Sequence, residues 1–277
     1  MKLKDRVALI TGSGSGFGRT IARQMAAEGA CIAVNDINPD GIEKTLSMLK
    51  ENGAQAIGLQ ADVGNVDQVR AMFEELVSRW GTLDILVNNA GFSARADWKE
   101  FTDAVNATYV RMTEETATLG KAQDGMRVTS SFKDEYWHSM IDVHLNGTFY
   151  CTREALKIME EKRRGKIINM ASICGMQGCP GAPSYSAAKG GIIAFTKSVA
   201  LEVIASGINV NAVAPGYVDT PLLDTMSPEV KAIITSRKPI GRMGKPGEIA
   251  NAVVFLSTDD ADFFVGQVIS PNGGMVV

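Results

Sequence analysis

The stretch Leu3-Lys-Asp-Arg-Val-Ala-Leu-Ile10, which runs directly into Thr11-Gly-Ser-Gly-Ser-Gly-Phe-Gly18, decides the fold of this chain. The first part is rich in apolar residues, as in a buried strand, and a helical pattern follows over residues 19–28. Glycines at a strand-to-helix turn let the backbone approach a pyrophosphate closely, and the helix N-terminus supplies free N–H groups and a favourable dipole. The pattern therefore predicts a dinucleotide site.

An acidic residue follows at the end of the next apolar run. Residues 31–34 lead into Asn35-Asp36, and Asp36 lies 24 positions past Gly12. A carboxylate at this place can hydrogen-bond both ribose hydroxyls of an adenosine. The alternative is that Asp36 only forms a turn before Pro39.

Tyr185 and Lys189 stand four residues apart in the stretch S-I-C-G-M-Q-G-C-P-G-A-P-S-Y-S-A-A-K, which begins at Ser172. On a helix they fall on one face, and a lysine cation beside a phenol lowers the pKa of the phenol. Such a tyrosine can exchange a proton near neutral pH, while a serine hydroxyl holds the oxygen of a carbonyl or alcohol. Taken alone, the spacing also fits an ordinary pair on a helix surface.

Apolar runs and helical patterns alternate along the chain. This alternation predicts an α/β fold with one Rossmann-type, doubly wound parallel sheet of about seven strands, covered by helices on both faces. The expected strands are residues 5–11, 31–35, 55–60, 84–88, 166–171, 207–213 and 266–270. The expected helices are residues 18–28, 39–52, 65–80, 133–162, 184–205 and 246–257. Ligands of such sheets bind beyond the carboxyl ends of the strands, where the polar residues of this chain gather.

Composition agrees with one enzyme-sized domain over residues 1–277, because no linker or charge block divides the chain. The net charge of −3 gives no sign of a nucleic-acid or membrane partner, and no apolar stretch is long enough to span a bilayer. The N-terminus lacks the pattern of a signal peptide. The four cysteines lack metal-site spacing and there are only two histidines, so we expect no metal site, reduced thiols and a cytoplasmic location.

With these features the chain resembles the classical short-chain dehydrogenase/reductase family over nearly its whole length. The resemblance depends on T-G-S-G-S-G-F-G (11–18), D-V (62–63), N-N-A-G (88–91), Ser172, Y-S-A-A-K (185–189), P-G-Y-V-D-T (215–220) and G-Q-V-I-S-P-N-G-G (266–274). It implies an oxidoreductase that acts on a CH–OH group with a nicotinamide cofactor.

The resemblance also assigns roles. It implies that Tyr185 is the general acid/base, that Ser172 holds the substrate oxygen, and that Lys189 tunes the tyrosine and binds the nicotinamide ribose. The expected cofactor-binding residues are Gly12, Ser15, Gly16, Phe17, Gly18, Asp36, Asp62, Val63, Asn89, Tyr185, Lys189, Pro215, Gly216, Val218 and Thr220. Asp36 favours NAD, because Ser13 and Ile37 stand where NADP-binding relatives place a basic residue.

One position departs from the family pattern. The stretch V-H-L-N-G-T-F places His144 where the family has an asparagine that helps to hold a water beside the lysine. An imidazole at this place can join the proton path, so we count His144 among the catalytic candidates. The alternative is a histidine that only fills the space.

The chain also carries an insertion over residues 92–133, after the fourth expected strand. Residues 97–110 place Trp98, Phe101, Val105 and Tyr109 on one helical face. A long loop in a compact domain is usually functional, so we expect a lid or a wall of the substrate site. A surface or subunit-contact elaboration is the alternative. Residues 221–238 form a second expected wall, with several apolar side chains.

The sequence therefore predicts an NAD-dependent enzyme that interconverts a secondary alcohol and a ketone, with a hydrophobic cyclic, aryl or steroid substrate. One alternative is a 3-oxoacyl-thioester reductase, for which we would expect NADPH. A non-catalytic NAD-binding sensor is less consistent with the presence of both Tyr185 and Lys189. Family resemblance and the apolar circumference of residues 184–205 predict a homotetramer.

Overall fold

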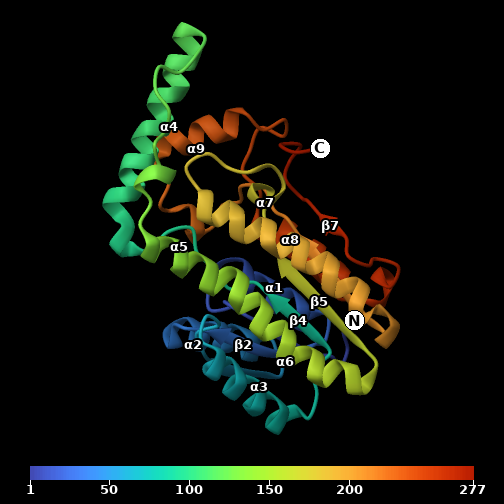
Figure 1. The fold of residues 1–277 in the computed structure, drawn as a ribbon. Helices are drawn as coiled ribbons and strands as arrows, with labels where there is room; N and C mark the ends of the chain where they lie inside the picture. Colours follow the sequence, from blue (N-terminus) through green and yellow to red (C-terminus); the bar gives the residue numbers. More distant parts are fainter.

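Seven parallel strands form one sheet in the computed structural model, which describes residues 1–277 except for the side chain of Ala96. The strands are β1 (Val7–Ile10), β2 (Cys31–Asp36), β3 (Ala56–Gln60), β4 (Ile85–Asn88), β5 (Gly165–Met170), β6 (Ile208–Val213) and β7 (Val268–Ile269). Their order in the sheet is β3-β2-β1-β4-β5-β6-β7. Figure 1 shows β4 and β5 in the interior of the molecule, surrounded by helices. The predicted α/β fold with a doubly wound, seven-stranded parallel sheet is confirmed.

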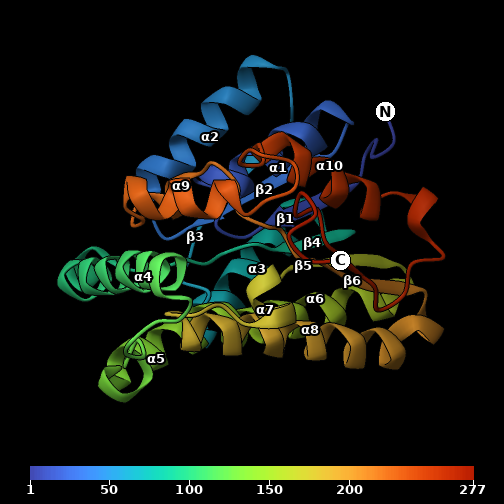
Figure 2. The ribbon, with the colours of Figure 1, turned by 90° about the horizontal axis from the view of Figure 1, so that it is seen from above.

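Helices cover both faces of the sheet and form two hydrophobic cores (Figure 2). One core lies under α1 (Gly16–Ala27), α2 (Pro39–Glu51) and α10 (Pro246–Leu256). The other lies under α3 (Val66–Trp80), α6 (Gly147–Lys162) and α8 (Pro183–Val203). The central strands are buried on both faces, which explains why they read as continuous apolar runs rather than alternating ones.

The chain order of the strands opens a crevice between β1 and β4. The chain runs outward from β1 to β3 and then returns to β4, on the other side of β1. Loops that leave β1 and β4 therefore diverge at this point, and ligands of open α/β sheets bind in such a crevice. The glycine-rich turn after β1 and the Asn89-Ala90-Gly91 turn after β4 face each other there.

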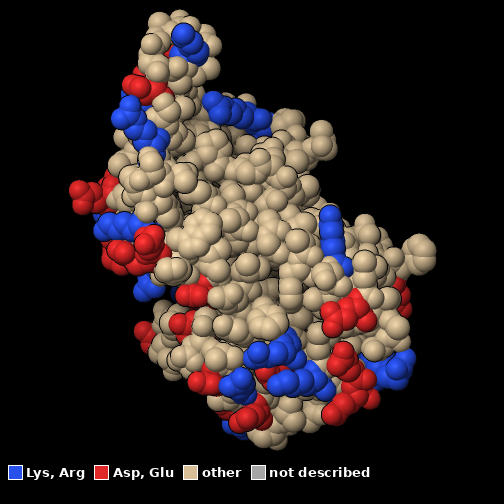
Figure 3. Space-filling model, in the orientation of Figure 1, with Lys and Arg blue, Asp and Glu red and all other residues tan. Residues whose placement is uncertain are grey.

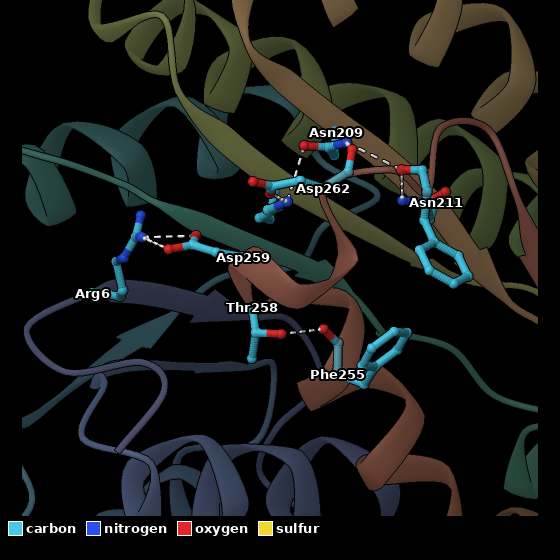
Figure 4. Close-up of polar contacts among 9 residues, drawn as sticks. Arg6, Asn209, Asn211, Phe255, Thr258, Asp259 and Asp262 are labelled. Atoms are coloured by element: carbon cyan, nitrogen blue, oxygen red, sulfur yellow. Dashed lines mark hydrogen bonds and ion pairs between the residues drawn. The ribbon is translucent and has the colours of Figure 1, made fainter.

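Polar contacts close the opposite end of the sheet. Lys166, near the start of β5, donates to Asp262 at 2.5 Å and to the side chain of Asn209 at 3.0 Å. Arg6 pairs with Asp259 in the same region (Figure 4). These contacts tie the segment after α10 to the amino ends of the strands and leave the carboxyl ends free for ligands.

The insertion forms its own helical structure. It contains a 3₁₀ turn (Ala96–Trp98), α4 (Lys99–Leu119) and a second 3₁₀ turn (Thr129–Ser131). The outer part of α4 and the segment that returns beside it project from the body of the molecule (Figure 1). The sequence pattern predicted a helix only to residue 110, whereas the helix continues through the mostly polar stretch R-M-T-E-E-T-A-T-L to Leu119.

Three other helical features differ from the sequence prediction. The expected helix over residues 133–162 consists of α5 (Asp134–Ile141), a π-helical turn (Asp142–Asn146) and α6. Two short helices, α7 (Ile173–Gln177) and α9 (Pro228–Ser236), were not predicted, because helices of this length carry too few periodic positions to recognise. Among the residues described, no helix has both the length and the apolar character needed to cross a membrane.

Candidate active site

Ser172 and Tyr185 are brought together by the close packing of α7 on α8. Ser172 follows β5 and caps α7, where its Oγ accepts a hydrogen bond from the Cys174 amide at 3.1 Å. A Cβ on Gly175 would lie only 2.5 Å from the carbonyl carbon of Lys189, so only glycine allows this approach. The side chains of Ser172 and Tyr185 border the same cavity, and hydrogen bonding from Ser172 acts to lower the pKa of the phenol.

Lys189 is buried beneath this pair. Its Nζ donates to the main-chain carbonyl of Met170 at 2.6 Å, which fixes the amine against the end of β5. Burial lowers the pKa of Lys189 to about 7. Burial also raises the pKa of Tyr185, and the hydrogen bond with Ser172 opposes that rise only in part. Burial of the phenol itself thus outweighs the lowering influence in this structure, and the tuning of Tyr185 by Lys189 stays a prediction.

His144 lies in the π-helical turn, buried against the same centre. Its ring is perpendicular to the ring of Tyr185, with centroids 5.4 Å apart. Burial and the nearby charge of Lys189 hold the pKa of His144 well below its ordinary value, so the imidazole is neutral at neutral pH. Nε2 contacts the main chain of Phe92, while Nδ1 is buried without a partner among the atoms described. The side chain thus contacts both Tyr185 and the start of the insertion, and a role in the proton path stays a prediction.

The glycine-rich turn is shaped for a phosphate group. A Cβ on Gly12 would lie 2.7 Å from Cα of Ala90, and one on Gly18 would lie 2.4 Å from the carbonyl oxygen of Gly12. Gly16 has a φ of +50° and open space where a Cβ would point, on the wall of the cavity. Asn89 braces the turn by donating to the Gly12 carbonyl at 3.1 Å. The residues present therefore fit a pyrophosphate at the N-terminus of α1.

Asp36 is held beside the same turn. Its Oδ2 accepts from the Gly14 amide at 2.9 Å and its Oδ1 accepts from the Asn38 amide at 3.0 Å. The bond from the Asn38 amide forms the local turn that the sequence analysis gave as the alternative role of Asp36. The bond from the Gly14 amide also orients the carboxylate toward the glycine loop. Ile37 is exposed next to it.

The structure changes which residues of the glycine-rich turn lie near the expected ribose site. Ser13 is fully buried and donates to the Ile10 carbonyl at 2.7 Å, so it does not face a ribose. The exposed position on the loop is Ser15, which borders the cavity. Arg19 was missed: its guanidinium donates to the Gly14 carbonyl and, at 2.9 Å, to Thr45. This cation braces the loop from the side of α2.

One cavity of about 470 Å³ joins the glycine turn to the Ser172–Tyr185 pair. Most of the predicted site residues line it: Gly12, Ser15, Gly16, Phe17, Asn89, His144, Ser172, Tyr185, Lys189, Pro215, Gly216, Val218 and Thr220. Gly18, Asp36, Asp62 and Val63 lie outside this lining. Gly18 packs beneath the turn, Asp62 accepts from the Gly64 amide at 2.8 Å, and Val63 packs against Gly147.

The insertion and the segment after β6 supply the other walls. Trp98, Phe101, Val105 and Tyr109, the face recognised in the sequence, all border the cavity. The aromatic side chains of Phe92, Phe132 and Tyr217 border it too, although the sequence analysis gave none of these three residues a role. Near Ser172, the side chains of Ile173 and Cys179 line the cavity, whereas the exposed Met176 does not.

The cysteines differ from the sequence prediction. Cys174 and Cys179 form a disulfide, whereas Cys31 and Cys151 are free. The bond closes a small loop between Ser172 and Tyr185, and both of its cysteines border the cavity. The five-residue spacing gave no sign of this pairing, because it depends on how α7 turns back toward α8. No group of three potential metal ligands occurs among the residues described.

Known proteins with similar sequences are oxidoreductases of one family. The sequence model of the family described as short chain dehydrogenase matches residues 6–231. The chain is 38% identical over 269 residues to a 3-oxoacyl-[acyl-carrier-protein] reductase, FabG, of Staphylococcus aureus, covering 97% of each chain. It is 34% identical over 274 residues to the (2S)-[(R)-hydroxy(phenyl)methyl]succinyl-CoA dehydrogenase subunit BbsD of Thauera aromatica, covering 99% of this chain and 98% of the relative.

Among solved structures, the crystal structure of levodione reductase superposes with a TM-score of 0.83 at 32% identity, over 98% of both chains. The family match, the relatives and the fold agree with the geometry of the cavity. The chain belongs to the short-chain dehydrogenase family and has the fold of its oxidoreductases.

Proposed function

We propose that this protein is an NAD(H)-dependent oxidoreductase that interconverts a ketone and a secondary alcohol. The observation that carries the proposal is the single cavity in which Ser172, Tyr185 and Lys189 lie beside a glycine turn shaped for a pyrophosphate. When bound, the nicotinamide supplies the hydride for ketone reduction, or accepts it from the alcohol. The overall reaction is ketone + NADH + H⁺ to alcohol + NAD⁺.

The side chains divide the remaining work. Ser172 donates a hydrogen bond to the substrate oxygen and holds it against the phenol. Tyr185 gives its proton to that oxygen in reduction and takes it back in oxidation. Lys189, with a pKa of about 7, can itself release or bind a proton near neutral pH and so resupply the phenol. The raised pKa of Tyr185 keeps the phenol protonated at neutral pH, which is the form that donates in ketone reduction.

For the substrate, we propose a 3-oxoacyl thioester or the corresponding hydroxyacyl thioester. The names of two relatives support this choice, since one is a 3-oxoacyl reductase and the other a dehydrogenase of an aromatic hydroxyacyl-CoA. The aromatic and aliphatic lining of the cavity accommodates an apolar acyl group. A hydrophobic ketone without a thioester is the second candidate, which the same lining and the likeness to levodione reductase favour.

The experiment is an assay of ketone reduction followed by NADH absorbance. The neutral thioester S-acetoacetyl-N-acetylcysteamine is compared with cyclic and aryl ketones of similar size, each with NADH and with NADPH. A higher kcat/KM for the thioester with NADH supports the proposal. Preference for the simple ketones selects the second candidate, and no turnover of any ketone or alcohol overturns both.

We also propose a homotetramer and a location in the cytoplasm. The face of α6 and α8 exposes Phe149 and Leu201, and Figure 3 shows few charges over α8. Light scattering tests the assembly, and a monomer at micromolar concentration would contradict it. The Cys174–Cys179 disulfide means that reduced cysteines no longer support a cytoplasmic location.

A further inference from the structure

The insertion turns the substrate side of the cavity into a channel. Along α4, Phe101, Val105 and Tyr109 repeat every four residues and all face the cavity. At a rise of about 1.5 Å per residue, this row is about 12 Å long. Phe101 belongs to the same apolar cluster as Tyr185, so the row begins next to the catalytic centre.

The opposite wall of the channel is hydrogen-bonded to the insertion. The side chain of Asn106 donates to the Thr225 carbonyl at 2.8 Å, and the Ser93 hydroxyl donates to the Leu222 carbonyl at 2.7 Å. Between these contacts the wall is mostly apolar, with Leu223, Met226, Val230 and Ile234 bordering the cavity. The two hydrogen bonds therefore link the insertion to the segment after β6, and both segments border the cavity.

A cation lies at the protein surface beyond the far end of the row, next to the cavity lining rather than within it. The Arg237 guanidinium donates to the Tyr109 hydroxyl at 3.0 Å and lies 5.8 Å from the centre of its ring. Arg237 has no ion pair with any carboxylate among the residues described. A guanidinium has five N–H donors, so most of them are free to bind an oxyanion.

We propose that the channel binds an elongated substrate whose chain ends in an oxyanion, held by Arg237 and Tyr109. This inference rests on the proposed reaction at Ser172 and Tyr185. The reacting carbonyl lies at the catalytic centre, the apolar chain follows α4, and the anionic group reaches the guanidinium. An extended chain advances about 1.1 Å per bond, so the row spans about ten bonds. A carboxylate at the end of an acyl chain and the phosphate of a phosphopantetheine thioester share the required chemistry.

Four probes test the idea with the full-length protein. The first is the short neutral S-acetoacetyl-N-acetylcysteamine. The second is ethyl 3-oxotetradecanoate, which is long and neutral, and the third is the 1-ethyl ester of 3-oxotetradecanedioic acid, which adds a terminal carboxylate. The fourth is acetoacetyl-phosphopantetheine. We expect one of the two anionic probes to have a KM about tenfold below that of the neutral probe of its own series, and added salt should narrow the difference. The anionic probe that shows the larger decrease in KM relative to its neutral counterpart identifies the source of the oxyanion.

Two substitutions locate the effect. Arg237→Gln should raise KM for the preferred anionic probe about tenfold, and by at least about threefold more than for the neutral probe of the same series. Val105→Trp should exclude the long probes, because Val105 already packs against Gly181 at the border of the cavity, so a larger side chain must occupy space inside it. Arg127→Gln and Ala107→Trp are matched controls at exposed positions of the insertion.

The outcomes separate the two proposals. Turnover of the short neutral probe, combined with equal KM values for charged and neutral probes in both wild type and Arg237→Gln, overturns the channel proposal alone. Absence of turnover with every probe overturns the proposed function itself. If Val105→Trp fails to fold, as judged by circular dichroism, the Arg237→Gln comparison still decides.

Discussion

Nε2 of His144 lies 2.9 Å from the carbonyl oxygen of Phe92 and 3.1 Å from its amide nitrogen. A neutral imidazole can satisfy only one of these two groups at a time, as a donor or as an acceptor. The buried ring therefore connects the π-helical turn to the first residue of the insertion through a bond that fits two tautomers. Protonation is disfavoured because the ring is buried near Lys189.

This burial predicts a dependence of stability on pH. The unfolded chain binds a proton at His144 below a pH of about 6.5, whereas the native protein does not. Stability contributed by the neutral form is thus present above that pH and is lost as pH falls below it. His144→Asn should flatten the fall in urea midpoint between about pH 6.5 and 5. His138→Gln, at the exposed histidine, is the control, and an unchanged slope in His144→Asn would contradict the prediction.

Replacing Lys189 should increase the stability of the protein at pH 7 while removing its activity. Burial lowers its pKa from 10.5 to about 7, so in that pH window the unfolded chain binds a proton that the native state lacks. Wild-type stability should therefore rise with pH from 7 toward 10. Lys189→Met should lack this rise, unfold at a higher urea concentration at pH 7, and lose activity. Lys197→Met, at an exposed lysine of α8, should follow the wild-type curve.

Tyr185→Phe tests the proton transfer directly. The variant keeps the ring that packs beside His144 but loses the hydroxyl that Ser172 contacts. We expect kcat to fall by about 10²–10⁴-fold, since general acid/base catalysis is lost. NADH binding, followed by fluorescence, should change little. A near-wild-type rate would remove Tyr185 from the mechanism.

Cofactor preference should depend on Asp36 and the residue after it. Asp36 accepts from the Gly14 amide, and Ile37 is exposed beside it. Asp36→Ala combined with Ile37→Arg removes a carboxylate and adds a fixed cation, so kcat/KM should shift from NAD toward NADP. Ile37→Gln serves as the uncharged control. Wild type that already prefers NADP would instead point to Arg19 as the cation that the sequence reasoning overlooked.

The disulfide should order the loop between Ser172 and Tyr185. A dithiol reduces Cys174–Cys179 by two electrons, giving two thiols and the oxidised dithiol. Because Cys179 and its neighbours border the cavity, releasing the loop should raise the KM of the ketone about two- to tenfold. The double variant Cys174→Ser, Cys179→Ser should show the same KM and no response to dithiol. Cys31→Ser should respond as wild type does, and identical KM values with and without dithiol would refute the prediction.

Much of the fold could be predicted because its signals are local. The strands are short apolar runs, and the glycine turn and Asp36 carry their own backbone requirements. Ser172, Tyr185 and Lys189, which the structure brings together in one cavity, were recognisable from spacing and family resemblance. The pKa of Lys189 was not, because it depends on how deeply α8 and β5 bury the amine together.

Contacts between distant segments account for the remaining differences. Phe92 meets His144 across 52 positions of sequence, and Tyr109 meets Arg237 across 128. The pairing of Cys174 with Cys179 depends on the path of α7. No pattern within one segment encodes such contacts, although the apolar face of the insertion did indicate which side of α4 would be covered.

The row of half-buried side chains on α4 has a thermodynamic consequence. No residue of α4 is fully buried, so the helix has little core of its own and depends on what lies beneath it. A ligand that fills the channel and binds only the closed form adds about 2.7 kcal/mol to the free energy of local opening at one hundred times its Kd. By reciprocity, any change that loosens α4 weakens substrate binding by the same factor. The local opening of α4 and the binding of ligand in the channel are thus thermodynamically coupled.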